Sequence, residues 1–255
     1  MRFFLIVLVV VAALSNEYHD EDLDGVIDSL DRCPHTPFND IVDEYGCSVE
    51  RLMRPKRLEQ SFEYLYIKDK QSRFKERDFV YNLSLYKDRF SLSFSIPYFF
   101  NASKEGLSDV SIEAEYRLTP TPMWDLYLDA GVQLPTFNVN GNRLDWGIGV
   151  RSDYFLSDYK LFSGLYYSLT QDRFRRKKAK NYYGVYGGAE YYWKGCLIDL
   201  AYIYNKGKFG RVSHFGYMKA EYLLNTHTFI YSYASFGLNK KAIDHIYAFG
   251  IGRRF

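Results

Sequence analysis

From residue 60 onward, the chain divides into runs of roughly nine to twelve residues in which apolar and polar side chains alternate. In the clearest run, residues 90–96, one face carries four apolar side chains and the other carries three serines. Residues 110–118 set an apolar face against the charged side chains Glu113, Glu115 and Arg117. A period of two predicts strands, and such charges would be costly in a core that is buried on both sides. The twelve runs cover residues 60–68, 78–86, 89–98, 108–118, 123–134, 144–155, 159–170, 181–193, 196–205, 212–224, 227–238 and 245–255.

The connections between these runs alternate in length. Those after the even-numbered runs are short: 87–88, 119–122, 156–158, 194–195 and 225–226. Those after the odd-numbered runs are longer and centre on residues 69–77, 99–107, 135–143, 171–180, 206–211 and 239–244. Short periplasmic turns alternating with longer outer loops are typical of transmembrane barrels. The sequence therefore predicts an all-β fold, an antiparallel transmembrane β-barrel of about twelve strands over residues 60–255, and a soluble β-sandwich is the alternative.

Composition and the last run point to a bacterial outer membrane. Aromatic residues make up 19% of the chain, yet its mean hydropathy is only −0.32, as expected when hydrated lumen side chains offset lipid-facing ones and aromatic girdles mark both interfaces. The run 245–255 ends on Phe255, and it resembles the terminal strand by which outer-membrane barrels are assembled. The girdle candidates are Trp124, Trp146, Trp193, Tyr154, Tyr183, Tyr191, Tyr202 and Tyr204.

The amino terminus has the pattern of an export signal. Met1 and Arg2 precede an apolar run over residues 3–14, and small residues at Ala13 and Ser15 suit cleavage after Ser15. At about twelve residues the run is too short for a membrane helix, which needs ~20. Residues 1–15 are therefore predicted to be a signal peptide.

Residues 20–31 have the spacing of an EF-hand calcium loop. Counting Asp20 as position one, carboxylates occupy positions one, three, five, nine and twelve, and Gly25 occupies position six. In that arrangement oxygen ligands surround a hard cation while the glycine makes the sharp turn. The predicted ligands are the side chains of Asp20, Asp22, Asp24, Asp28 and Asp31 with the backbone carbonyl of Val26. An acidic solvated linker is the alternative.

The same segment, continued through the Cys-Pro-His-Thr-Pro sequence at 33–37 and the closing Gly-Cys at 46–47, resembles one thrombospondin type 3 repeat over residues 20–48. That resemblance implies calcium as the bound ion and a disulfide between Cys33 and Cys47, which an oxidising periplasm would permit. The predicted organisation is thus a small calcium-binding repeat at 16–48, a linker at 49–59 and the barrel. The third cysteine, Cys196, falls inside a strand and is expected to be a small buried side chain.

Alternation places an excess of acidic side chains on the predicted lumen face. The candidate lumen residues are Glu113, Glu115, Arg117, Asp129, Asp145, Arg151, Glu190 and Asp199, with Glu63, Asp125, Asp153, Lys219 and Glu221 on the same face. Such a lumen would favour cations or neutral polar solutes; alternatively, acids and bases pair and fill a narrow barrel. The longest basic stretches are the connections holding Lys68, Lys70, Arg73, Lys75 and Arg77 and, further on, residues 173–180. These could meet the phosphates of lipopolysaccharide.

Catalysis is not expected, because His214, His227 and His245 stand in no recognisable catalytic motif. Residues 107–118, 131–136 and 144–150 are similar to the putative outer-membrane transporters of the MetA-pathway-of-phenol-degradation family, a resemblance that implies passage of small molecules. The predicted function is a passive channel or small-molecule transporter with outer-membrane lipid, lipopolysaccharide and a small solute or ion as partners, and no nucleic acid. The alternative is a closed structural or adhesive barrel whose basic outer loops bind lipopolysaccharide or another surface.

Overall fold

The computed structural model describes residues 19–22, 24–32, 36, 41–42, 45–46, 48–50, 54–69, 74–101, 104–121, 123–137, 142–156, 159–174, 177–193, 196–208 and 210–255. The predicted signal peptide and both cysteines of the predicted disulfide, Cys33 and Cys47, lie outside these residues. Within them, no helix is long and apolar enough to cross a membrane.

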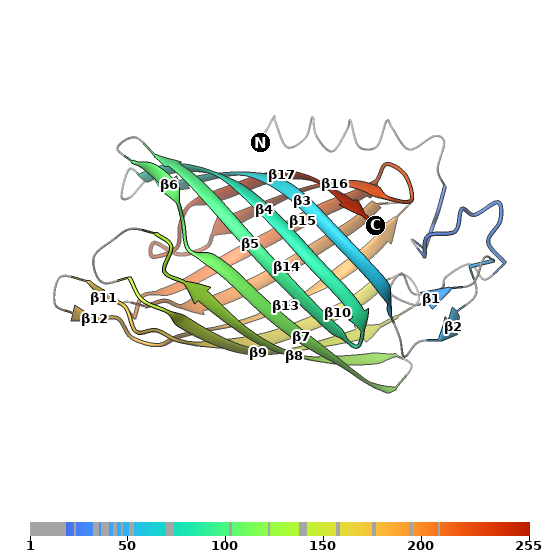
Figure 1. The fold of residues 1–255 in the computed structure, drawn as a ribbon, viewed down its shortest axis with the longest axis horizontal. Coiled ribbons are helices and arrows are strands. Elements are labelled where there is room, and N and C mark those ends of the chain that lie inside the picture. Colours follow the sequence, from blue (N-terminus) through green and yellow to red (C-terminus); the bar gives the residue numbers. More distant parts are fainter. Residues whose placement is uncertain are drawn as a thin grey trace.

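Twelve long antiparallel strands form a closed barrel (Figure 1). Each strand pairs with its neighbours in the sequence, and the sheet closes where β17 pairs with β3. The predicted strand number and the predicted fold are therefore confirmed. The strands are β3 (Arg54–Asp69), β4 (Phe74–Asp88), β5 (Phe90–Asn101), β7 (Val110–Thr121), β8 (Trp124–Leu134), β9 (Asp145–Phe155), β10 (Tyr159–Leu169), β13 (Tyr182–Trp193), β14 (Cys196–Lys206), β15 (Val212–Leu223), β16 (Thr228–Gly237) and β17 (His245–Arg254).

Five short strands lie outside this set. β6 (Glu105–Leu107) pairs with the far end of β5. β11 (Arg173–Phe174) pairs with β12 (Lys177–Lys178) in the connection between β10 and β13. β1 (Ile41–Val42) and β2 (Ser48–Glu50) form a two-stranded ladder at the barrel end where β17 finishes (Figure 1).

The first three barrel strands are longer than the sequence predicts. β3 begins at Arg54, so residues 54–59 of the predicted linker belong to the barrel, and Leu58 exchanges backbone hydrogen bonds with Phe255. At the other end, β3 and β4 continue until only residues 70–73 separate them. Lys68, Lys75 and Arg77 therefore lie in strands rather than in a loop. In β3 and β4 the pattern hid these extensions because charged residues interrupt the apolar face there.

The barrel wall has an apolar outer face and a polar inner face. Leu165, Val185, Leu200 and Ile251 are exposed on the outer face, and the predicted girdle tryptophans are exposed with them. Such a surface is stable only against lipid. Buried polar side chains of the barrel, such as Arg117, Asp125 and Lys160, point inward, so polar contacts in the lumen replace much of an ordinary apolar core.

The structure shows which side chains of β16 face the lumen, a question that its weak alternation leaves open. Its aromatic side chains at 229, 231 and 233 compete in the sequence with Ile230, Ala234 and Phe236 for the apolar face. In the structure, Phe229 and Tyr231 lie against Gly252 and Gly250 of β17. Tyr231 and Tyr233 donate hydrogen bonds to Glu63, at 2.9 Å each, which places them inside the lumen.

Candidate functional site

The eight predicted lumen residues lie on the inner face, because they alternate with exposed apolar side chains. In β7, Glu113, Glu115 and Arg117 alternate with Tyr116, which is 43% exposed. In β8 and β9, Asp129 and Arg151 alternate in the same way with exposed Leu128 and Tyr154. The remaining members, Asp145, Glu190 and Asp199, share this face by strand register.

One network of charged groups crosses five strands of the inner wall. The guanidinium of Arg117 lies 3.2 Å from Asp125, and that of Arg151 lies 3.1 Å from Glu115 and 3.2 Å from Asp153. The two guanidinium groups neutralise these carboxylates, and their planar shape suits the geometry of a carboxylate. These ion pairs connect the inner faces of β7, β8 and β9.

The same network continues into β10 and β13 through a lysine that sequence reasoning missed. Lys160 is buried and lies 2.7 Å from Glu190 and 3.7 Å from Asp153. Its position could have been found from alternation, since Lys160 has the parity of the inner-facing residues of β10.

A second network of charged groups lies where the barrel closes, between the last strands of the sequence and the first. Arg254 of β17 lies 3.1 Å from Glu59 and 2.9 Å from Glu221, and Lys219 lies 2.8 Å from Glu221. Glu59 falls in the predicted linker, where no sequence pattern indicates Arg254 as its partner. These contacts join β15, β17 and β3.

Several inner acidic side chains form no ion pair. Among the described residues, Glu113, Asp129, Asp199 and Asp78 make no ion pair within 4.0 Å. A buried oxygen of Asp78 and one of Asp199 also have no hydrogen-bond partner within the described structure. The lumen therefore holds a surplus of negative charge, which attracts cations.

Three outer connections meet at Lys208. Its Nζ lies 2.5 Å from Asp145 and 2.7 Å from Asp172, and both carboxylates are nearly fully buried. Asp172 also accepts a hydrogen bond from the Arg143 backbone at 2.8 Å, and the Lys180 backbone donates to the Lys208 carbonyl at 2.8 Å. We call these residues the Lys208 latch. A lysine in a loop has no sequence pattern to reveal such contacts.

The amino-terminal segment brings three predicted calcium ligands together. Oxygen atoms of Asp20, Asp22 and Asp24 lie within 4.8 Å of one another. Gly25 has a φ of +98°, as the sharp turn requires. One oxygen of Asp20 and one of Asp24 are buried without a hydrogen-bond donor among the described residues.

Burial and mutual repulsion perturb these carboxyls. Burial, with the nearby charges of Asp24 and Asp22, raises the pKa of Asp20 to about 7. Burial, with the charges of Asp22 and Asp31, likewise raises the pKa of Asp24 to about 7, and burial raises the pKa of Asp22. A divalent cation would remove this repulsion.

The other predicted ligands lie differently. Asp31 lies close to the first three, since its carboxyl and that of Asp24 both flank Gly46. Asp28 instead accepts a hydrogen bond from the Glu21 backbone and lies 2.7 Å from His19. Among the described residues, no contact of the Val26 carbonyl distinguishes it as a ligand.

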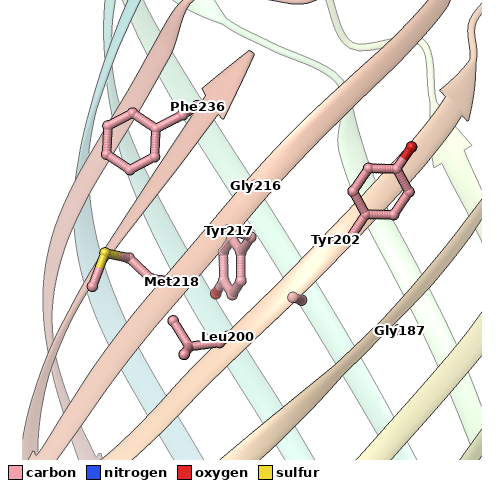
Figure 2. Close-up of a pocket in the computed structure, with 8 residues that line it drawn as sticks. Gly187, Leu200, Tyr202, Gly216, Tyr217, Met218 and Phe236 are labelled. Carbon is pink, nitrogen blue, oxygen red and sulfur yellow. The ribbon is translucent and has the colours of Figure 1, made fainter. Parts of the chain in front are cut away.

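A shallow apolar groove of about 390 Å³ lies on the lipid-facing wall (Figure 2). It forms where two outward-facing glycines, Gly187 and Gly216, leave space between larger neighbours, including Leu200, Tyr202 and Phe236. The ladders of β13 to β16 run without a register shift beneath it. The groove is therefore a surface feature rather than an opening through the wall.

The backbone is similar to those of bacterial outer-membrane channels. The COG4313 outer membrane channel from Pseudomonas putida F1 matches with a TM-score of 0.61 and 16% identity, over 78% of this chain and 96% of that chain. The fold is that of an outer-membrane β-barrel. The KdgM porin, solved in complex with disordered oligogalacturonate, matches with a TM-score of 0.55 and 12% identity over 76% of this chain and 99% of its own. The NanC porin gives 0.55 and 11%, over 78% and 98%.

The chain matches no family model and no curated protein. The resemblances to the phenol-degradation transporters and to a thrombospondin type 3 repeat thus remain predictions. The closed barrel and its apolar outer surface place the chain in the outer membrane.

Proposed function

We propose that the protein is a passive channel for cations and small neutral polar solutes. The observation that carries this proposal is the surplus of inner acidic side chains, among which Glu113 and Asp129 form no ion pair within 4.0 Å in the described structure. Negative charge concentrated in a water-filled lumen raises the local concentration of cations. The channel fold of the similar structures supports the same role, and no catalytic role is proposed.

Recording from the purified protein in a planar bilayer tests this proposal. A channel is expected to give discrete conductance steps. Silence across varied voltage and salt would contradict it and would favour the closed structural barrel, whose inner ion pairs fill the lumen.

Calcium is proposed as the ligand of the amino-terminal segment. Its support is the convergence of Asp20, Asp22 and Asp24, together with buried oxygens that have no donor in the described structure. Hard oxygen ligands of this kind suit calcium. The Asp at position twelve is shorter than the usual Glu, and affinity in the range of extracellular calcium modules, about 10⁻⁴–10⁻³ M, is expected.

Calorimetric titration of the full-length protein in detergent tests the calcium site. Asp24→Asn is expected to weaken binding about tenfold or more, because it removes a charged ligand from the cluster. Glu21→Gln is the matched control, since Glu21 is exposed and stands between ligand positions. Equal binding by both variants, or no saturable heat with the unaltered protein, would rule out this site.

Lipopolysaccharide is the proposed partner in the outer leaflet. Basic side chains stand at the outer ends of β3 and β4, where Lys75 and Arg77 are exposed. Phosphate groups of that lipid would meet them with charge-assisted hydrogen bonds.

A further inference from the structure

Three basic side chains form a cluster on the outer surface of β3 and β4. Lys68 is directly opposite Lys75 in the ladder, and Arg77 is opposite Tyr66, one pair further along the same face. None of the three makes an ion pair among the described residues. Like charges placed opposite each other destabilise a sheet. An anion bound between them would offset that repulsion.

The cluster faces lipid rather than the lumen. Lys75 and Arg77 have the parity of Phe79, which is 55% exposed, and Lys68 has the parity of Phe62, which is 62% exposed. They stand at the barrel end opposite the short turns, which is the outer end in barrels of this class. The acidic side chain on this face nearest in register, Glu105, is two strands from Arg77.

A band of aromatic side chains lies next to the cluster: Phe100 is opposite Arg77 in the ladder, and Tyr64, Phe79 and Tyr98 lie one pair further toward the membrane centre. The rings of Tyr64 and Phe79 have centroids 5.3 Å apart, and Phe79 lies 5.8 Å from Phe100. Tyr98 lies 4.9 Å from Phe100. Aromatic side chains at this depth pack against acyl chains just beneath the headgroups.

The apolar groove lies on the same face, deeper in the membrane. In the ladder, Lys68 is opposite His245, His245 is opposite Phe236, and Phe236 is opposite Gly216 in the groove (Figure 2). Two strands, β17 and β16, lie between Lys68 and Gly216, and three interstrand spacings of ~4.8 Å give a separation of about 14 Å. Gly216 is four residues inside the outer end of β15, whereas Lys75 is one residue inside that of β4. A cationic site at headgroup depth is thus followed by apolar surface at acyl-chain depth.

We propose that the outer surface from β15 through β17 to β5 binds one lipopolysaccharide molecule. Lys68, Lys75 and Arg77 hold a lipid A phosphate, and the acyl chains lie over the aromatic band and toward the groove. Lipopolysaccharide is the proposed occupant for two reasons. Its phosphates complement the charge of the cluster, and lipid A is the phosphorylated, multiply acylated lipid of the outer leaflet, at the depth of the cluster. This inference rests on the outer-membrane location and on the lipid partner proposed above, and not on conduction through the lumen.

Thermal unfolding of the full-length barrel in detergent, with increasing lipopolysaccharide, tests the site. The variant is the triple substitution Lys68→Gln, Lys75→Gln and Arg77→Gln. Its apparent affinity is expected to fall roughly a hundredfold, as loss of three basic contacts to an anionic headgroup implies. The control removes equal charge at the other end of the barrel, with Lys56→Gln, Lys87→Gln and Arg89→Gln, and is expected to bind as the unaltered protein does.

Two further lipids separate the possible outcomes. Dephosphorylated lipid A is expected to give no stabilisation, and phosphatidylglycerol only a weak one. Equal binding by the triple variant and its control would overturn the proposal, and so would equal stabilisation by phosphatidylglycerol, which would indicate a general preference for anionic lipid. A gel that separates folded from heated barrel confirms that each variant is folded. Conductance of the triple variant, expected to be unchanged, keeps this result independent of the channel proposal.

Discussion

At the scale of single residues, the lumen wall depends on aromatic rings that lie flat over glycines of the adjacent strand. Four such pairs line the inner face, and in each a side chain on the glycine would overlap the ring: Gly164 with Tyr186, Gly184 with Tyr166, Gly250 with Tyr231, and Gly252 with Phe229. Glycines in strand interiors cost stability unless a neighbouring group covers them. Glycine has a low strand propensity, but at these four positions it leaves space in the lumen for the neighbouring ring.

Gly250→Ala is expected to destabilise the barrel by about 1–3 kcal/mol, the usual cost of adding a methyl group to a packed site. The added carbon would displace Tyr231, which donates a 2.9 Å hydrogen bond to Glu63. Urea-dependent unfolding in micelles measures the change. Gly147→Ala is the control, because its added carbon meets only Ser168, at 3.6 Å. Equal destabilisation by both would show that the Tyr231 contact is unimportant.

Residue partners were the least predictable part of the site. Alternation identified inner-facing acids such as Glu113 and Asp129, because parity alone determines which face a strand residue occupies. It could not pair Arg254 with Glu59, since these residues are 195 positions apart and meet only through barrel closure. Loop residues such as Lys208 have no parity to follow.

At the scale of strands and loops, the number and order of the strands were predictable, and their ends were not. A strand crossing lipid must show one apolar face, so each crossing leaves a pattern of period two. Beyond the acyl-chain region that requirement ends, and β3 and β4 continue with charged residues on both faces. The cluster of Lys68, Lys75 and Arg77 belongs to this continuation.

The Lys208 latch ties three outer connections together at this scale. Lys208→Gln removes the charge held by Asp145 and Asp172 and leaves two nearly buried carboxylates facing each other. Without the charge of Lys208, the three outer connections lose the ion pairs that join them and become more mobile. Single-channel recordings are expected to show longer or more frequent fluctuations between conductance levels than in the unaltered protein.

Lys206→Gln is the matched change, since the Nζ of Lys206 lies 5.6 Å from the ring centroid of Tyr183 and not in the latch. Its recordings are expected to resemble those of the unaltered protein. Identical gating in both variants would show that the latch does not restrain the outer connections.

At the scale of the whole molecule, the barrel separates two chemical surfaces with one layer of chain. Outward side chains meet lipid along the apolar wall, and inward side chains carry ion pairs with a surplus of acid. The segment proposed to bind calcium precedes the barrel, and a basic cluster stands at the barrel's opposite end. The proposed preference for cations depends on the inner surplus of acid, because a lumen with balanced charge would not distinguish ions by sign.

The zero-current potential across a planar bilayer under a salt gradient tests that claim most directly. The unaltered protein is expected to give the sign of a cation-selective pore, and the double variant Glu113→Gln with Asp129→Asn is expected to give a smaller potential. Glu105→Gln, on the outer face, is expected to leave the potential unchanged. A potential of the opposite sign, or one that the double variant does not reduce, would contradict a cation-favouring lumen.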